Sequence, residues 1–203
     1  MKMKICVVGL WHLGLVTSVC LAQKKHKVIA TDFDKKLLTN VLEGQYKLIE
    51  NDLQVNLDKY RKNNFIKIVK NINSFINSAD YIWVNYDTPV NNKDIGDDSF
   101  IINKIIKVIS LLKKKSNIII SSQLPIGSIK KIEKISKINH NFICIPENLK
   151  IGEGIKSFNN QTRIIVGIRK NFLKKKIQIL LKDFTKEIVF MKIESAEMTK
   201  HAL

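Results

Sequence analysis

Short, fully apolar runs alternate with amphipathic stretches along the chain. A run such as Ile5 to Val8 contains no polar position, which is typical of strands buried on both faces of a sheet. The segment from Ser99 to Leu112 instead repeats its apolar residues every three or four positions, which predicts an amphipathic helix. This alternation predicts an α/β fold with a Rossmann-type, doubly wound and mainly parallel sheet.

The same pattern gives approximate bounds for the elements. Strands are expected at residues 4–9, 26–32, 65–69, 81–86, 117–122, 141–145, 162–168 and 187–191. Helices are expected at residues 12–23, 35–44, about 52–62, 71–80, 99–112, 129–137, about 171–182 and from 193 onward. Asp34 can cap the second helix and Gly44 can end it, whereas residues 146–161 are expected to form a loop. No stop signal follows the last helix, so its pattern is unfinished at Leu203.

Composition and charge narrow the possible functions only slightly. The 203 residues are 45% hydrophobic and 26% charged, which is ordinary for a globular protein. No apolar run reaches the ~18 residues that a membrane span requires, so we expect no membrane association. The formal charge of +17 would suit a polyanion, but the lysines are abundant along the whole chain and only Arg61, Arg163 and Arg169 are arginines. We therefore expect surface composition rather than a nucleic-acid site.

The N-terminus and the cysteines indicate the cellular compartment in which the protein is expected. The basic, apolar start lacks a small-residue cleavage site and continues into a strand–helix–strand unit, so we expect no signal peptide. Cys6, Cys20 and Cys144 are widely spaced and odd in number. This pattern predicts buried, reduced thiols in a cytoplasmic protein and no metal site.

The first strand leads into the turn "GLWHLG", which is the first candidate for chemistry. Gly9 and Gly14 occupy the first and third glycine positions of a dinucleotide fingerprint, but Trp11 stands where the second glycine is expected. Asp32 follows Gly14 by 18 residues, at the end of the second strand. An acidic residue there would bind a ribose hydroxyl and repel a 2′-phosphate, which favours NAD over NADP.

Three further polar motifs fall at the ends of predicted strands. The fourth strand ends in "YDTPV", the fifth in "SSQLPIGS" and the sixth in "PENLKIGEG", and these motifs contain the chain's three prolines. Each motif alone could be an ordinary loop. Together they mark the carboxyl edge of a parallel sheet, where such folds bind ligands.

In this order and spacing, the motifs resemble the N-terminal domain of the UDP-glucose/GDP-mannose dehydrogenase family. The resemblance rests on the glycine turn, "LIENDL", "DTP", "SSQLPIGS", "PENLKIGEG" with the following "TRIIVG", and "SAEMTKHAL". It implies an NAD-binding domain over residues 1–193 and the start of a long central interdomain helix at 194–203. It also implies a homodimer formed through that helix. The activity it implies is NAD-dependent oxidation of the C6 alcohol of a UDP- or GDP-sugar to a carboxylate, for polysaccharide precursor synthesis.

The resemblance assigns roles to individual positions. Glu147 would handle protons or order a water, Lys200 would stabilise the oxyanion that develops at C6, and Gln123 would help to hold the catalytic water. Thr88 and Ser122 would line the nicotinamide side, and Asp32 would bind ribose. The turn residues expected to contact the cofactor are Gly9, Leu10, Trp11, His12, Leu13 and Gly14.

The sequence departs from the family pattern at several positions. Gln123 stands where the family usually has Thr, and Asn51-Asp52 replaces Pro-Gly. The family's nucleophilic cysteine belongs to a C-terminal half that lies beyond Leu203. Cys6, Cys20 and Cys144 fall in apolar core patterns and cannot replace it.

Two other functions stay open from the sequence. One is an NAD-dependent dehydrogenase of the 3-hydroxyacid type, which also uses a lysine on an interdomain helix. The Pro-Glu loop argues against it, since that chemistry does not require one. The other is a stand-alone nucleotide-binding module without catalytic activity.

Overall fold

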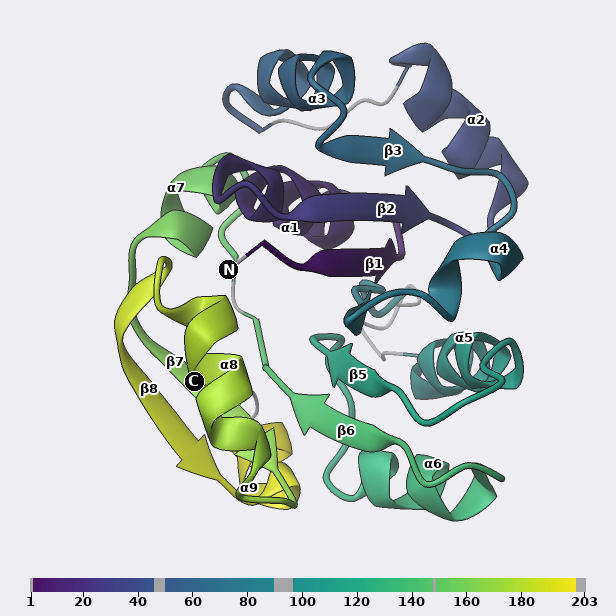
Figure 1. Ribbon diagram of the computed structural model, residues 1–203, viewed down its shortest axis with the longest axis vertical. Helices are drawn as coiled ribbons and strands as arrows, with labels where there is room; N and C mark the ends of the chain where they lie inside the picture. The colour runs from purple at the N-terminus through teal and green to yellow at the C-terminus, as the bar shows by residue number, and fades with distance from the viewer. Residues whose placement is uncertain (1, 46–49, 90–96, 148, 200–203) are drawn as a thin grey trace.

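The eight strands form one sheet in the order β3-β2-β1-β4-β5-β6-β7-β8 in a computed structural model of the chain (Figure 1). The structure describes residues 2–45, 50–89, 97–147 and 149–199. The strands are β1 (Lys4–Val8), β2 (Lys27–Thr31), β3 (Ile66–Ile68), β4 (Tyr81–Val84), β5 (Asn117–Ile120), β6 (Asn141–Cys144), β7 (Gln161–Ile168) and β8 (Thr185–Met191). All neighbours run parallel except β6 and β7. The predicted mainly parallel, doubly wound sheet is therefore confirmed.

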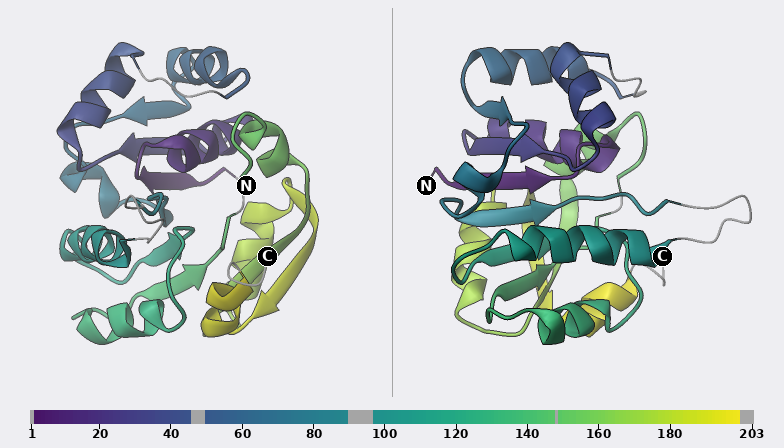
Figure 2. Two further views of the ribbon diagram at one scale, coloured as in Figure 1. Left: turned by 180° about the vertical axis from the view of Figure 1, so that it is seen from behind. Right: turned by 90° about the vertical axis from the view of Figure 1, so that its right-hand side faces the viewer.

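Helices cover both faces of this sheet (Figures 1 and 2). They are α1 (His12–Gln23), α2 (Lys35–Glu43), α3 (Leu53–Lys62), α4 (Asn73–Ile76), α5 (Asp98–Ser110), α6 (Ser128–Ile135), α7 (Gly154–Asn159), α8 (Leu173–Leu181) and α9 (Ile193–Thr199). One core cluster joins α1, α2, α3, α7 and α8 to one face, and the other joins α4, α5, α6 and α9 to the opposite face. Burial on both sides explains why the strands contain so few polar residues.

The chain reverses its direction across the sheet at β1. After β1 it proceeds outward through β2 and β3, then returns to β4 on the other side of β1. The crevice at the carboxyl ends of β1 and β4 is therefore the topological switch point, where doubly wound sheets bind ligands. Helix α1 begins at this point and is buried from His12 to Ala22, because it packs between the sheet and helices α3 and α7.

Several boundaries differ from the predicted ones. The predicted helix at 71–80 contains only the short α4, and β8 begins two residues earlier than expected. The predicted loop at 146–161 contains helix α7, whose sequence has low helix propensity. The side chain of Glu50 accepts hydrogen bonds from backbone N–H groups at the start of α7, and this long-range contact was not visible in the local pattern. Asp34 caps α2 and Gly44 ends it at a φ of 73°, as predicted.

Parts of three predictions concern residues whose structure is not described. They are segment 46–49, most of the polar loop at 90–96, and the end of the last predicted helix at 200–203. Among the described residues, no helix combines the length and apolar character needed to cross a membrane. The same residues contain no group of His, Cys, Asp or Glu side chains that could hold a metal ion.

Candidate cofactor site at the carboxyl edge of the sheet

The glycine turn is held by backbone packing. Gly9 has a φ of 105°, and an added Cβ would lie 2.6 Å from the carbonyl oxygen of Asn85. A Cβ on Gly14 would lie 1.7 Å from the carbonyl oxygen of Gly9. Both positions therefore require glycine, and Gly14 allows α1 to approach the end of β1 closely.

Trp11 occupies the N-cap of α1, in the place of the second glycine. Its backbone is extended, and its side chain makes no capping hydrogen bond. The indole is 48% exposed and lines a cavity of about 420 Å³ together with Asp32, Tyr86 and Thr88. The first turn of α1 itself carries no acidic side chain.

Asp32 lies at the end of β2 and is only 6% exposed. Its Oδ2 accepts a hydrogen bond from the Leu10 N–H at 2.7 Å, and its Oδ1 accepts one from the Asp34 N–H at 2.8 Å. Burial raises the pKa of Asp32, while these two backbone hydrogen bonds and the nearby ammonium of Lys104 act in the opposite direction. Tyr86 Oη also donates a hydrogen bond to Oδ1 at 3.5 Å, so Oδ2 is the oxygen that retains a lone pair for a ribose hydroxyl.

The motifs after β4 and β5 contact each other. Thr88 Oγ1 donates a hydrogen bond to the Gln123 carbonyl oxygen at 3.1 Å, and Ser122 Oγ accepts one from the Tyr86 N–H at 2.9 Å. The side chain of Gln123 is exposed, whereas Ser122 is buried. Both loops therefore lie at the same edge as the glycine turn, as the sequence predicted.

Glu147 follows β6 at the position equivalent to Gln123 after β5. The strand register pairs Ile120 with Cys144, and each of the two polar residues lies three positions further along its strand. Glu147 is 6% exposed, and its Oε2 accepts a hydrogen bond from Gln161 Nε2 at 3.3 Å. Lys200, the other predicted catalytic residue, lies outside the described residues.

His12 was predicted to contact the cofactor, but its ring takes part in a structural contact. The ring is buried, and its Nε2 lies 2.8 Å from Oε2 of Glu50, whose side chain is 1% exposed. Burial alone would raise the pKa of Glu50, but hydrogen bonds from His12 and from the backbone N–H groups of Gly154, Ile155 and Gly152 lower it. His12 can therefore offer only its backbone to a cofactor at the turn. The sequence analysis included Glu50 in the motif "LIENDL" without assigning it a role.

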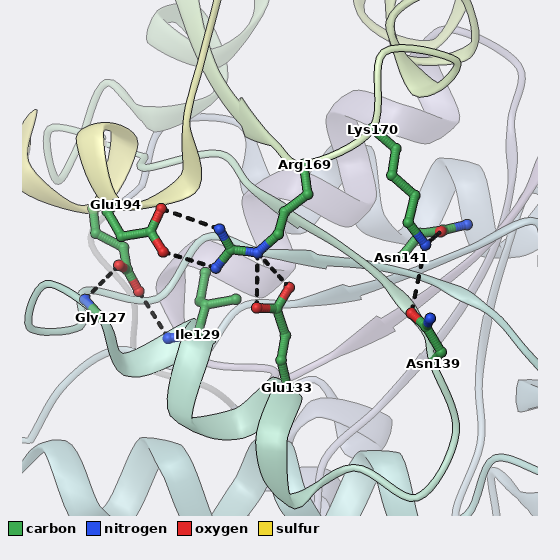
Figure 3. A network of polar contacts seen from close by, with 9 residues as sticks. Gly127, Ile129, Glu133, Asn139, Asn141, Arg169, Lys170 and Glu194 are labelled. Carbon is green, nitrogen blue, oxygen red and sulfur yellow. Dashed lines mark hydrogen bonds and ion pairs between the residues drawn. The ribbon is translucent and has the colours of Figure 1, made fainter.

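Glu197 is a second residue whose role the sequence analysis missed. It projects from α9 and is 4% exposed. Its Oε2 accepts a hydrogen bond from the Gly127 N–H at 2.7 Å, and its Oε1 accepts one from the Ile129 N–H at 2.9 Å. The two donors, Gly127 and Ile129, are labelled in Figure 3. Glu197 thus caps α6 from another helix and joins the "AEMTK" and "PIGS" motifs. In the sequence, the available signal was an acidic residue on the same side of the helix as Ile193 and Ala196, which are both buried.

The cysteines cannot supply a nucleophile in this structure. All three are free and buried. Burial raises the pKa of Cys6 and of Cys144 to about 12 each, and it also raises the pKa of Cys20. Because the thiolate is the reactive form, these thiols are unreactive near neutral pH, in agreement with the prediction from the sequence.

The residues of the site suit a dinucleotide. A close-packed glycine turn, a helix N-terminus without acidic residues and a carboxylate at the end of β2 are the parts that hold a pyrophosphate and a ribose. The cavity between Trp11, Asp32 and Tyr86 offers aromatic and polar surface beside that carboxylate. The described residues therefore fit a nicotinamide dinucleotide, which supplies hydride acceptance when bound.

Comparisons with known proteins agree with this geometry. Residues 3–185 match the UDP-glucose/GDP-mannose dehydrogenase family, NAD binding domain. UDP-glucose 6-dehydrogenase TuaD of Bacillus subtilis is 26% identical over 98% of this chain and 44% of its own length. UDP-N-acetyl-D-mannosamine dehydrogenase of Methanococcus maripaludis is 29% identical over 97% of this chain and 46% of its own length. The chain thus spans about half the length of these curated relatives.

Solved structures show the same fold. GDP-mannose dehydrogenase of Pseudomonas aeruginosa superposes with a TM-score of 0.87 at 19% identity, covering 98% of this chain and 49% of that one. A UDP-glucose dehydrogenase of Pyrobaculum islandicum superposes with a TM-score of 0.86 at 18% identity, covering 100% of this chain and 49% of that one. A 3-hydroxyisobutyrate dehydrogenase of Mycobacterium tuberculosis, of the type considered as an alternative, gives 0.65 at 13% identity over 99% of this chain and 58% of that one. The match over residues 3–185 shows that this chain belongs to the UDP-glucose/GDP-mannose dehydrogenase family and is an NAD-binding domain of that family.

Proposed function

We propose that this chain provides the NAD-binding part of an enzyme that oxidises the C6 alcohol of a UDP- or GDP-sugar to a carboxylate. One observation carries the proposal. The motifs that follow β1, β4, β5 and β6 lie at the carboxyl edge of the sheet, and those after β1 and β4 line the cavity at the crevice where the strand order reverses.

The proposed roles of individual residues follow from their positions. The turn from Gly9 to Gly14 would bring backbone N–H groups near the pyrophosphate, and Asp32 would accept hydrogen bonds from the ribose of the adenosine half. Thr88 and Ser122 would border the nicotinamide half. Glu147, Gln123 and Lys200 stay proposed catalytic residues. The adjacent positions of Gln123 and Glu147 after neighbouring strands support a shared role near the reacting carbon.

The assembly and location of the whole protein are also proposals. Similarity to the family supports a nucleotide-sugar substrate, a division near residue 193 and a homodimer formed through the helix that starts there. Three reduced, buried cysteines suit a cytoplasmic protein. Sedimentation of the full-length gene product at micromolar concentration tests the dimer, and a monomer would contradict it.

Calorimetry with NAD tests the central proposal. We expect the chain to bind NAD and Asp32→Ala to weaken binding about 10-fold, because ribose hydrogen bonds to a carboxylate are lost. Asp80→Ala is the matched control, because Asp80 also accepts a backbone hydrogen bond, from the Lys4 N–H, at the opposite end of the sheet. Equal weakening by both changes would contradict the assignment of the ribose site to Asp32.

Trp11 allows a second test of the same cavity. The exposed indole borders the place where the adenosine half is proposed to lie, so we expect Trp11→Gly to weaken NAD binding about 3- to 5-fold through lost contact area. Trp11→Phe, which keeps an aromatic ring, should retain most of the affinity. A large gain in affinity on Trp11→Gly would instead show that the indole obstructs the pyrophosphate.

A further inference from the structure

Lys104 brings a positive charge to the adenosine side of the cofactor site. It lies on α5, is half-buried and lines the same cavity as Asp32. Its ammonium is 4.9 Å from the ring centre of Phe100, 5.6 Å from that of Tyr86 and 5.9 Å from that of Phe33. Three aromatic rings therefore confine this ammonium beside the cavity.

The charges around the cavity are mixed. Asp32, Asp34 and Asp87 line it, and Lys104 is the one basic side chain among its described lining residues. The electrostatic effect of Lys104 on Asp32 shows that the two groups interact. Helix packing holds the backbone at Lys104 in place, since Ile101 and Ile105 on the same helix are fully buried.

This arrangement changes what Asp32 alone predicts about the cofactor. A carboxylate at the end of β2 repels a 2′-phosphate on the adenosine ribose, so it favours NAD. A cation that faces the same cavity attracts that phosphate, and the attraction is strengthened where the ammonium is partly withdrawn from water. We propose that Lys104 is a specificity-determining residue of this site, which accepts the ribose 2′-phosphate and lets the chain bind NADP as well as NAD, with NAD still preferred. The proposal depends on the cofactor site being at this edge of the sheet.

The test compares both dinucleotides on three proteins by calorimetry. We expect the unaltered chain to bind NADP within about 30-fold of NAD, and Lys104→Met to weaken NADP about 10-fold and NAD less than about 3-fold. Lys107→Met is the matched control. Lys107 lies one turn further along α5, with its ammonium 4.3 Å from the Phe33 ring centre, but it is not among the residues that line the cavity. Lys107→Met should leave the ratio of the NADP and NAD dissociation constants within about 2-fold of its value in the unaltered chain.

The outcomes separate this proposal from the underlying cofactor assignment. If NAD binds and Lys104→Met changes both affinities equally, or Lys107→Met changes the ratio as much, the proposal for Lys104 is wrong and the cofactor site stands. If NADP binds more than about 1,000-fold weaker than NAD, Asp32 alone sets specificity and the proposal is again wrong. If neither dinucleotide binds the unaltered chain, both are wrong. Lys104→Arg, which keeps the charge, should retain most of the NADP affinity.

Discussion

The glycine turn and the junction of α6, β7 and α9 are both packed against the sheet, but different forces hold them. At the turn, Gly9 and Gly14 are in contact through backbone atoms, and the N-cap residue makes no side-chain hydrogen bond. At the junction, Glu197 caps α6 from another helix, and Arg169 forms paired contacts with Glu133 and Glu194 (Figure 3). The turn depends on the absence of side-chain atoms at Gly9 and Gly14 and on one carboxylate, Asp32, which accepts the Leu10 N–H, whereas the junction depends on several charged side chains.

The difference matches the proposed task of each region. A pyrophosphate needs bare backbone near the start of α1, and charged side chains would compete with it there. Helix α9 is instead fixed on α6 and on the end of β7, and the proposed catalytic Lys200 follows Thr199, the last residue of α9, in the sequence. Carboxylates that accept two N–H groups each fix both position and orientation. Substitutions in the two regions should therefore differ in size and in their response to salt and pH.

The largest effect is expected for Gly14→Ala. The added Cβ would lie 1.7 Å from the Gly9 carbonyl oxygen, so α1 would have to move away from β1. We expect the free energy of unfolding to fall by more than about 4 kcal/mol, with little folded protein recovered. Gly44→Ala is the control: it has a φ of 73°, but an added Cβ would meet only Gln54 Nε2 at 3.6 Å, an ordinary van der Waals contact, and it should cost only about 1 kcal/mol in urea unfolding. Similar losses for both variants would contradict the close-packing argument.

Glu197→Ala should have the second largest effect. It leaves two N–H groups at the start of α6 without their acceptor, the buried one of Ile129 and the partly buried one of Gly127, so we expect a loss of about 2 to 3 kcal/mol. Glu197→Gln keeps one acceptor oxygen and should lose about half as much. Urea unfolding measures both, and Glu187→Ala, at an exposed position of β8, is the control. A loss below about 0.5 kcal/mol would show that α9 does not hold α6 in place.

Glu50→Gln should change the pH dependence of stability. The folded-state pKa of Glu50 lies below its ordinary value of 4.5, so ionised Glu50 stabilises the fold above pH 4.5. This contribution disappears as the pH falls through the folded-state pKa. We therefore expect the variant to lose about 1 to 2 kcal/mol at pH 7 and much less at pH 3. Urea unfolding midpoints at pH 7 and pH 3 measure this loss. The control Glu43→Gln, at an exposed position, should show the same small change in stability at both pH values.

Arg169→Met should have the smallest effect. The side chains of Arg169, Glu133 and Glu194 are 34%, 25% and 32% exposed, so solvent screens their attraction. The hydrogen bonds that Arg169 donates to Glu133 and Glu194 raise the pKa of Arg169, and they lower the pKa of Glu194. We expect a loss of about 1 kcal/mol at low salt that shrinks in 0.5 M NaCl. Lys150→Met, which removes an ion pair exposed at 77% and 52%, should change nothing measurable. A loss at Arg169 that is independent of salt would indicate packing instead of charge.

The predictability of the fold and the site differed from element to element. Strands such as β1 and β4 were visible because burial on both faces leaves only apolar residues. Gly9, Gly14, Asp32 and the Thr-Pro motif were visible because few residue types can serve at a tight turn or a strand end. The roles of His12 and Glu50 and the formation of helix α7 were hidden, because they depend on contacts between residues 38 positions apart for His12 and Glu50 and more than 100 positions apart for Glu50 and the start of α7.

The sequence by itself determined the fold class, the family and the edge of the sheet at which the cofactor motifs gather. Apolar periodicity and turn chemistry are local properties, and the order of the motifs restricts how a parallel sheet can be wound. Only the tertiary structure decided which polar side chains form contacts within the fold and which face the cofactor cavity. It placed the His12 ring on Glu50, used Glu197 to cap α6, and turned Trp11 and Lys104 toward the same cavity as Asp32. These choices depend on which groups meet when distant segments pack, and no local pattern encodes the partner of a buried charge.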